Sequence, residues 1–354
     1  MKKTSIWLSD LTHTAQGISA ATFPLGVSYV YSYAKKVLGN EFDFRLFKFP
    51  NHLNAALKDQ LPTMLCFSCY SWNFEIAYKF ASLVKQFDPK VVIVFGGPNF
   101  PTTKEEKFEF LKLRSFIDFF VELEGELGFV NLVQKLIAND FNAEKLKKNY
   151  ISLMNTCYIY DNRLISGSVE RIKDINIIPS PYLTGVLDEY FDLPLIPMIE
   201  TTRGCPFSCT FCADGSIIKN KVYRYDSQRV KEELHYIAKR KKNISELIIT
   251  DLNFAMYKQD IERIEATFFE TITTMACWYF NKENVEKVVN SIMTGGVDGE
   301  EIPGRRVLIN PIPLYQNATI SENVWKKFDA LPSQSLPKKR PRPIPFASKY
   351  KNMY

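Results

Sequence analysis

The sequence predicts an α/β protein in which an N-terminal doubly wound domain is followed by a second αβ region. Strand-like apolar runs alternate with helix-like segments over residues 1–140, and the alternation resumes near residue 195 and weakens after about residue 265. Strands that alternate with helices of this size favour a parallel sheet covered by helices on both faces. With 354 residues, 46% hydrophobic and 24% charged, the chain has the balance of a globular protein of two domains. This composition excludes a wholly disordered chain, a collagen-like chain and a disulfide mini-protein.

The elements of the N-terminal domain follow from hydrophobic periodicity. Pro24 opens a helix, because a proline in the first turn loses no hydrogen bond there. The clearest strand is residues 90–98, which is rich in β-branched residues and is stopped by Gly96-Gly97-Pro98. The other predicted strands and helices are residues 5–8, 42–49, 64–70 and 116–123, and residues 74–87 and 127–137. They place a domain over residues 1–140.

The rest of the chain divides into a connector, a second αβ region and a tail. Residues 141–194 are predicted as a connector with short strands at 150–160 and 164–166. Residues 195–330 form the second region, with a strand at 196–201, a cysteine-rich loop, a helix at 227–239 capped by Ser227, and a strand at 246–251. No regular βα alternation is legible beyond about residue 265. Residues 331–354 form a basic, proline-rich tail, and such a composition cannot build a core.

The net charge of +6 is explained by this tail. Residues 331–354 hold six Lys and Arg and no acid, and the remaining chain has 39 basic and 39 acidic residues. The charge therefore does not favour nucleic acid as a partner. No apolar run reaches the 18 or so residues of a membrane span, and the N-terminal apolar stretch is too short for a signal peptide. A cytoplasmic location is expected.

Three of the seven cysteines, Cys205, Cys209 and Cys212, lie within eight residues. In a reducing compartment such a cluster indicates a metal or catalysis more than disulfides. A four-residue step and then a three-residue step can wrap one loop around an iron–sulfur cubane, with three thiolates on three irons and one iron open. Zinc is the main rival, although the nearest histidine is His235, and chance packing is the third reading. Cys66 and Cys69 form a C-x-x-C pair inside an apparent strand, which indicates packing.

The C-x3-C-x-aromatic-C pattern after Arg203-Gly204 resembles the radical SAM superfamily. Four further segments, residues 23–26, 95–98, 124–126 and 179–182, resemble the branch with an N-terminal cobalamin-binding domain. The resemblance covers about residues 1–260. It implies a Rossmann-like cobalamin-binding domain followed by a radical SAM partial (βα) barrel, which is shortened or divergent here because only its first two strands are legible.

The resemblance also implies a chemistry. The three cysteines would hold a 4Fe-4S cluster whose open iron binds S-adenosylmethionine. One electron would cleave the sulfonium, and the resulting 5′-deoxyadenosyl radical would take a hydrogen atom from an unactivated carbon. Phe211 would pack near the adenine. Thr250, Asp251 and Asn253 match the region that contacts the methionine amino group, and they could equally cap a loop.

Cobalamin is implied at the strand ends of the N-terminal sheet. The residues from Asp10 to Gly17 form a stretched version of the Asp-x-His-x-x-Gly loop that ligates cobalt in many cobalamin domains, so His13 is a candidate ligand and otherwise a loop histidine. Ser68, Gly96, Gly97 and Glu124 lie where the tail or ring of the cofactor would approach. The glycines could instead turn the chain, and Ser68 could belong to the core.

The leading hypothesis is a radical SAM enzyme that functionalises a C–H bond, with cobalamin-assisted methylation as the favoured reaction. The acceptor would be a small molecule, a lipid or a peptide, and the electron donor a protein such as a flavodoxin or ferredoxin. The alternative is a catalytically impaired cobalamin and iron–sulfur module that binds or regulates. A zinc-ribbon-like interaction protein, with the basic tail on nucleic acid, is the third hypothesis.

Overall fold

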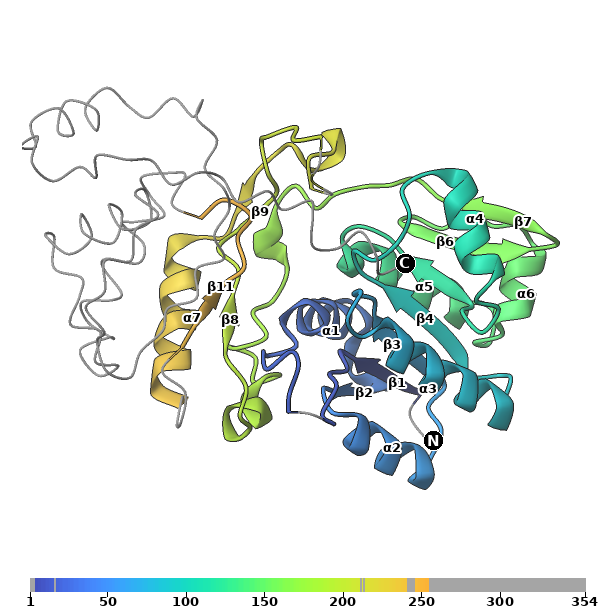
Figure 1. Cartoon of the computed structure of the whole chain (residues 1–354), viewed down its shortest axis with the longest axis horizontal. Coiled ribbons are helices and arrows are strands. Elements are labelled where there is room, and N and C mark those ends of the chain that lie inside the picture. The colour runs from blue at the N-terminus through green and yellow to red at the C-terminus, as the bar shows by residue number, and fades with distance from the viewer. Residues whose placement is uncertain (1–3, 16, 211, 213, 241–245, 255–354) are drawn as a thin grey trace, which may run out of the picture. The chain divides into compact units, whose positions relative to one another are not determined.

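The computed structural model describes residues 4–254 apart from residues 16, 211, 213 and 241–245. All of these belong to one compact unit, residues 1–309 (Figure 1). The expectations for residues beyond about 265, for the tail and for Phe211 lie outside the described residues. Within the described part of the chain, no helix combines the length and the apolar character that crossing a membrane requires.

The N-terminal half is built on a seven-stranded sheet with the order β2-β1-β3-β4-β5-β6-β7. The first five strands in this order are parallel, β6 pairs antiparallel with β5, and β7 pairs antiparallel with β6. This confirms the predicted parallel sheet, and the two connector strands extend it. The strand bounds are Thr4–Ser9 (β1), Phe42–Phe47 (β2), Met64–Ser68 (β3), Val92–Gly96 (β4), Phe119–Val121 (β5), Thr156–Tyr160 (β6) and Arg163–Ser166 (β7).

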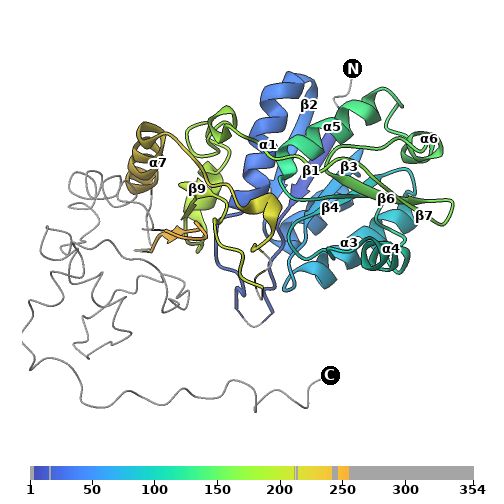
Figure 2. The ribbon, with the colours of Figure 1, turned by 90° about the horizontal axis from the view of Figure 1, so that it is seen from above.

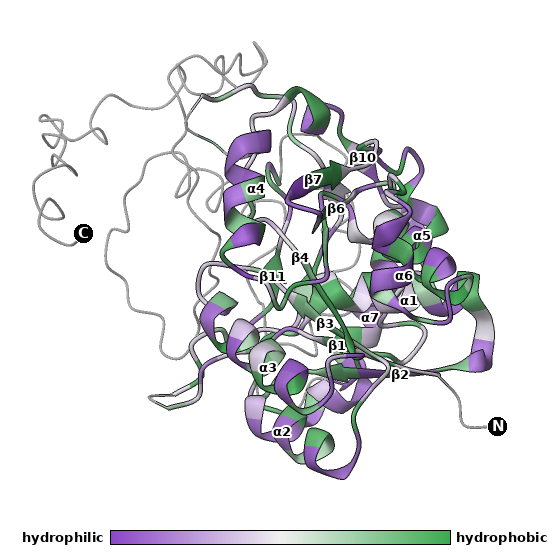
Figure 3. Ribbon diagram, turned by 90° about the vertical axis from the view of Figure 1, so that its right-hand side faces the viewer, coloured by the Kyte–Doolittle hydropathy of each residue, from purple (hydrophilic) through white to green (hydrophobic). Residues whose placement is uncertain are grey.

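Helices cover both faces of the sheet, as Figure 2 shows. One face packs against α1 (Leu25–Leu38), α5 (Gly125–Ile137) and α6 (Ala143–Lys148), and the other against α2 (Pro50–Asp59), α3 (Phe74–Phe87) and α4 (Lys104–Lys112). Successive strand residues alternate between the two cores: Ile6 and Leu8 belong to one, and Trp7 to the other. The central strands β3 and β4 are accordingly mainly hydrophobic, while the outer helices are polar on one side (Figure 3). The doubly wound prediction is therefore confirmed.

Cys66 and Cys69 confirm the prediction that they serve packing. Both are free and buried, Cys66 on β3 and Cys69 directly after it. Burial raises the pKa of the Cys69 thiol to about 12 and that of Cys66 still further. Neither thiol is therefore ionised near neutral pH, which a redox pair would require.

The second part of the chain contains one βαβ unit. The parallel strands β8 (Met198–Ile199) and β11 (Ile248–Ile249) flank helix α7 (Ser227–Arg240) in sequence, and the antiparallel pair β9 (Thr202–Arg203) and β10 (Tyr223–Arg224) lies between them in the chain. Both predicted strands are present but shorter than expected. Ser227 is the first residue of the helix and not its cap, because the carbonyl of Asp226 accepts from the amide of Val230 (3.1 Å). The short 3-10 helices are η1 (Gly39–Glu41), η2 (Ile175–Ile177), η3 (Asp188–Asp192) and η4 (Ile217–Lys219).

A third core joins this part to the N-terminal domain. It combines Phe23 and Tyr29 at the start of α1, a run of apolar residues between Ile172 and Leu195, and the buried face of α7. Within it lies Glu233 of α7, whose side chain is 1% exposed and pairs with Arg229 at 3.0 Å. Burial raises the pKa of Glu233, and Arg229 offsets only part of this effect.

This buried glutamate gives stability an unusual dependence on pH. The folded protein holds the Glu233 proton to a higher pH than the unfolded chain, whose glutamate pKa is about 4.3. Ionisation therefore costs stability as the pH rises from about 4.3 through the raised pKa. We expect the native chain to lose stability relative to a Glu233→Gln variant over this rise. Urea unfolding of both proteins from pH 4.5 to 8 measures the difference, and a relative gain with rising pH would contradict the assignment.

Candidate functional site

A buried polar network lies at the carboxyl ends of β1, β2 and β3. Asp10 follows β1, and its carboxylate pairs with Lys48 Nζ at 2.8 Å. Lys48 directly follows β2, and its side chain is only 2% exposed. Ser68, the last residue of β3, donates its hydroxyl to Asp10 Oδ1 at 2.5 Å. Asn73 Nδ2 donates in turn to Ser68 Oγ at 2.9 Å. Strand order reverses between β1 and β3, and ligands of open α/β sheets bind in the crevice at this point.

Gly96 and Gly97 bring the ends of β3 and β4 together. The amide of Cys69 donates to the carbonyl of Gly96 at 2.7 Å. Gly97 has a φ of +136°, and a Cβ there would lie 2.7 Å from the Cys69 carbonyl oxygen. Glycine is needed at this position because both the dihedral angle and the contact exclude a side chain. The backbone geometry thus explains why residue 97 is a glycine. Contact with a cofactor remains a prediction for both Gly96 and Gly97.

The loop after β1 carries His13, which is exposed. Its carbonyl accepts from the amide of Ser19 at 3.1 Å. In the segment after β3, Trp72 is 51% exposed and stacks on the partly exposed Tyr70, with ring centroids 4.4 Å apart. Lys48, Asn73 and Trp72 were not singled out from the sequence. Trp72 and Asn73 directly follow the predicted strand at 64–70, which was a signal that could have found them, whereas Lys48 lies within the predicted strand at 42–49 and follows β2 only in the structure.

The cysteine loop is closed at its base by the β9–β10 pair, in which Arg203 is opposite Tyr223. Inside this stem the amide of Cys205 donates to the carbonyl of Lys219 at 2.9 Å. Gly204 has a φ of +115°, and a Cβ there would lie 2.2 Å from the carbonyl oxygen of Lys221. Only glycine permits this crossing, so Arg203-Gly204 sets the entry of the chain into the loop.

Cys205, Cys209 and Cys212 differ from the other described cysteines in exposure. Cys205 and Cys209 are partly exposed and Cys212 is exposed, and all three are free. Free and accessible thiols on one loop fit a metal or cluster in the type of donor. Among the described residues, no set of three or more His, Cys, Asp or Glu side chains is arranged to hold a metal ion. The structure thus brings the three cysteines onto one closed loop without gathering their sulfurs into a ligand set.

The end of β11 lies beside the entry of this loop. The amide of Thr250 donates to the carbonyl of Ile199 at 2.8 Å. Asp251 accepts from the amide of Thr201 (2.6 Å) and from the Thr201 and Thr202 hydroxyls (2.5 and 2.9 Å). Burial raises the pKa of Asp251, although these donors favour its ionised form. Asn253 Nδ2 donates to Cys205 Sγ at 3.0 Å.

Two arginines tie the loop stem to the start of α5. Arg203 pairs with Glu126 at 3.1 Å and with Glu200 at 2.8 Å. Arg171 pairs with Glu124 Oε1 at 2.9 Å and donates to the Lys221 carbonyl at 2.8 Å. The other Glu124 oxygen accepts from the amide of Ile172 at 2.5 Å. Both oxygens of Glu124 therefore have partners in the protein, and its predicted role toward cobalamin remains untested.

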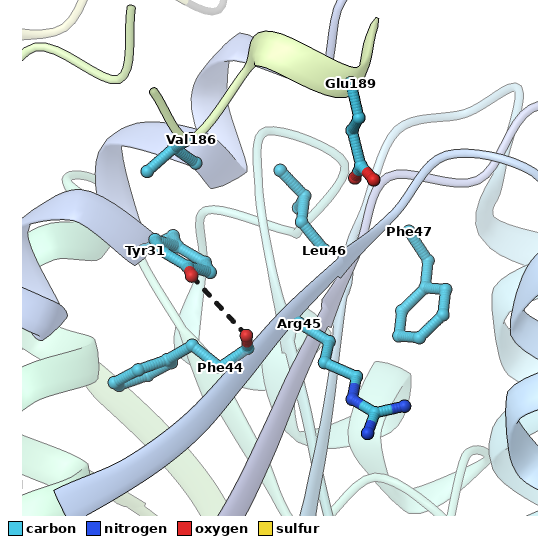
Figure 4. A pocket seen from close by; sticks show the side chains of 7 residues that line it. All are labelled: Tyr31, Phe44, Arg45, Leu46, Phe47, Val186 and Glu189. Atoms are coloured by element: carbon cyan, nitrogen blue, oxygen red, sulfur yellow. Dashed lines mark hydrogen bonds between the residues drawn. The ribbon is translucent and has the colours of Figure 1, made fainter. Parts of the chain in front are cut away.

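A shallow pocket of about 300 Å³ lies elsewhere, along the edge strand β2 (Figure 4). It is lined by Tyr31, Phe44, Arg45, Leu46, Phe47, Val186 and Glu189. The Tyr31 hydroxyl donates to the Phe44 carbonyl at 3.4 Å, and the Tyr190 hydroxyl to the Leu46 carbonyl at 3.1 Å. These tyrosines satisfy carbonyls of an edge strand, which would otherwise be free to pair with a strand of another chain. The pocket is thus explained by protection of the sheet edge.

Comparison with known proteins identifies the architecture. Residues 18–133 match the B12 binding domain family. The 2-(S-pantetheinyl)-carbapenam-3-carboxylate methyltransferase of Streptantibioticus cattleyicolor is 30% identical over 258 residues, which is 70% of this chain and 36% of the relative. The cobalamin-dependent radical SAM methyltransferase TokK of Streptomyces tokunonensis is 29% identical over 57% of this chain and 29% of its own length. The chain is thus similar to cobalamin-dependent radical SAM methyltransferases, and its N-terminal part matches the B12 binding domain family.

Solved structures support the same fold. The cobalamin-dependent S-adenosylmethionine radical enzyme OxsB aligns over 83% of this chain and 42% of its own, with a TM-score of 0.56 and 15% identity. The radical S-adenosylmethionine methyltransferase TsrM of Kitasatospora setae aligns over 76% of this chain and 51% of its own, with a TM-score of 0.51 and 13% identity. The chain spans about a third of the length of the two curated relatives.

The predicted site residues of this chain therefore separate into two groups. Ser68, Gly96 and Gly97 meet at the carboxyl ends of β3 and β4, with His13 on the loop after β1. The three cysteines share one loop, and Thr250, Asp251 and Asn253 lie along its entry. Glu124 contacts the stem of that loop through Arg171. The ligand contacts of all these residues remain predictions.

Proposed function

We propose that this chain acts as a radical SAM enzyme that cleaves S-adenosylmethionine reductively and functionalises a C–H bond of an acceptor, with cobalamin-assisted methylation as the reaction. The observation that carries the proposal is the accessible three-cysteine loop, held by buried ion pairs to a domain of the B12 binding family. The names of the methyltransferase relatives support methylation.

The 4Fe-4S cluster would be held by Cys205, Cys209 and Cys212. When bound, the reduced cluster and cobalamin supply the electron for cleavage of the sulfonium and the carrier for the methyl group. The chain's own residues position these groups. Gly204 lets the backbone enter the loop, and Asp251 fixes the end of β11 against Thr201 and Thr202. S-adenosylmethionine would lie beside this strand end, near Thr250, and Phe211 is proposed to pack near its adenine.

Cobalamin would occupy the crevice at the carboxyl ends of β1 and β3. Ser68 and Asp10 form its polar floor, and the Lys48 ammonium compensates the Asp10 carboxylate. The charge of the floor is therefore balanced within the protein, which suits a large and mostly uncharged macrocycle. Trp72, in the segment after β3, offers an exposed ring.

The acceptor of the reaction is a small molecule, a lipid or a peptide, and a flavodoxin or ferredoxin supplies the electron in the cytoplasm. The acceptor class, the electron donor and the location are carried over into the proposal from the sequence analysis. Free accessible thiols on the cysteine loop favour a reducing compartment.

An anaerobic assay of the native chain tests the proposed function. The protein is reconstituted with iron and sulfide, mixed with S-adenosylmethionine, and assayed for 5′-deoxyadenosine with and without dithionite. We expect product only with the reductant, and one bound cobalamin per chain when hydroxocobalamin is added and free cofactor is removed. A reconstituted cluster without product would favour the binding or regulatory module. A colourless protein with one zinc would overturn both.

A further inference from the structure

The segments after β8 and β11 stay in contact beyond the ends of the two strands. Ile199 is paired with Ile249 within the sheet, and the amide of Thr250 still donates to the carbonyl of Ile199. The next contacts join Asp251 to Thr201 and Thr202, and the last joins Asn253 to Cys205. Asn253 is therefore placed by a series of contacts that begins in the sheet.

The contact between Asn253 and Cys205 has a defined chemistry. Asn253 Nδ2 donates to the Cys205 sulfur at 3.0 Å. The amide of Cys205 is itself engaged by the Lys219 carbonyl at 2.9 Å, so both the backbone and the side chain of this cysteine are held. A cysteine sulfur accepts such a bond more strongly as a thiolate than as a thiol, because the charge strengthens the bond.

We propose that Asn253 is a positioning residue that tunes the iron–sulfur cluster by donating a hydrogen bond to the Cys205 thiolate. This inference rests on the proposed function. Hydrogen bonds to the sulfurs are among the factors that set the reduction potential of a cluster. An N–H donor withdraws electron density from the thiolate and favours the reduced form, which carries one more negative charge. Asn253 thus makes the cluster easier to reduce.

Asn253 can donate to Cys205 and still make the predicted contact with S-adenosylmethionine. Nδ2 is used on the sulfur, whereas an amino group would need the acceptor Oδ1. The neighbouring Asp251 differs, because both of its carboxylate oxygens already accept from Thr201 or Thr202. Asp251 acts here by fixing the segment that carries Asn253.

The test is a redox titration of the reconstituted cluster, monitored by electron paramagnetic resonance without S-adenosylmethionine. Asn253→Leu removes the donor at similar volume, and Asn253→Asp keeps the shape but replaces the N–H by an oxygen that only accepts. We expect both midpoint potentials to become more negative. The ratio of reduced to oxidised cluster at a fixed potential should fall about tenfold, which is about 59 mV for a one-electron couple.

The control is Asn139→Leu, which makes the same change at an exposed amide that donates to the Lys135 carbonyl. This variant should keep the native potential. If the native chain loads its cluster and both Asn253 variants keep the native potential, the inference is overturned while the proposed function stands. If Asn253→Leu fails to assemble a cluster, the midpoint potential of Asn253→Asp decides whether the inference holds. A native chain that assembles no cluster overturns the proposed function and this inference together.

Discussion

Replacing Cys209 by alanine is expected to abolish the formation of 5′-deoxyadenosine. Cys209 is the middle thiol of the loop and is free and partly exposed, so its removal leaves two of the three proposed thiolates. Iron–sulfur clusters are held by thiolates, and two of them would not retain a four-iron cluster through purification. The iron content of the reconstituted variant, its absorbance near 400 nm and its product yield should all fall to background.

The matched control for this variant is Ser208→Ala, which removes one heavy atom from the adjacent exposed residue of the same loop. It should retain cluster, product and cobalamin. Cys209→Ala should also bind cobalamin as the native chain does, because the polar floor of Asp10, Lys48 and Ser68 lies on the N-terminal sheet. Product from Cys209→Ala at the native level would exclude the loop as the cluster site.

Replacing Glu126 by alanine is expected to destabilise the protein by about 3–5 kcal/mol at pH 8, because it leaves a buried arginine with an incomplete partner set. The Glu126 side chain is 4% exposed and that of Arg203 is 16% exposed, and they pair at 3.1 Å. Burial raises the pKa of Glu126 and Arg203 opposes the shift, so the measurement is made at pH 8, well above the usual range of a carboxyl. Urea unfolding followed by circular dichroism measures the loss.

Glu144→Ala is the control for this measurement, since it removes a glutamate from another helix of the same domain. The Glu144 side chain is 76% exposed and lies 3.9 Å from Lys147, and such surface pairs contribute about 0–1 kcal/mol. A triple variant, Glu126→Ala with Arg203→Met and Glu200→Gln, should recover part of the lost stability, because the charge of Arg203 and those of both its partners are then removed together. Equal losses in Glu126→Ala and Glu144→Ala would contradict the role given to the Glu126–Arg203 pair.

Helices with several buried apolar residues at regular spacing were predictable from the sequence, and helices with only one buried residue were not. The predicted helix over residues 74–87 is α3 at the same bounds, and four of its residues are buried. Helices α2 and α4 were not predicted; Leu53 is the one buried residue of α2, and Leu111 that of α4. A single buried side chain leaves no periodicity to detect, so these helices form because the sheet offers them a surface to cover.

The candidate site divides in the same way. The cysteine loop was predictable because its chemistry lies in residue types and spacing within eight residues. Asp10 was visible as the start of a motif, but its pairing with Lys48 joins residues 38 positions apart. Glu124 was singled out as a cofactor contact, and its bond to Arg171, 47 positions away, was not foreseen. No local pattern marks such pairs.

The sequence by itself determined the doubly wound α/β class, the place of the strands in the N-terminal domain and the loop that carries the three cysteines. These depend on periodicity and on residue types that are close in the chain. Only the tertiary structure decided that Asp10, Ser68 and Lys48 form one polar network, that Glu126 and Glu124 hold the loop stem, and that Asn253 faces Cys205. The physical reason is that hydrogen bonds and ion pairs act over a few ångströms, and only the folded arrangement of the strands, helices and loops brings such distant residues within that range.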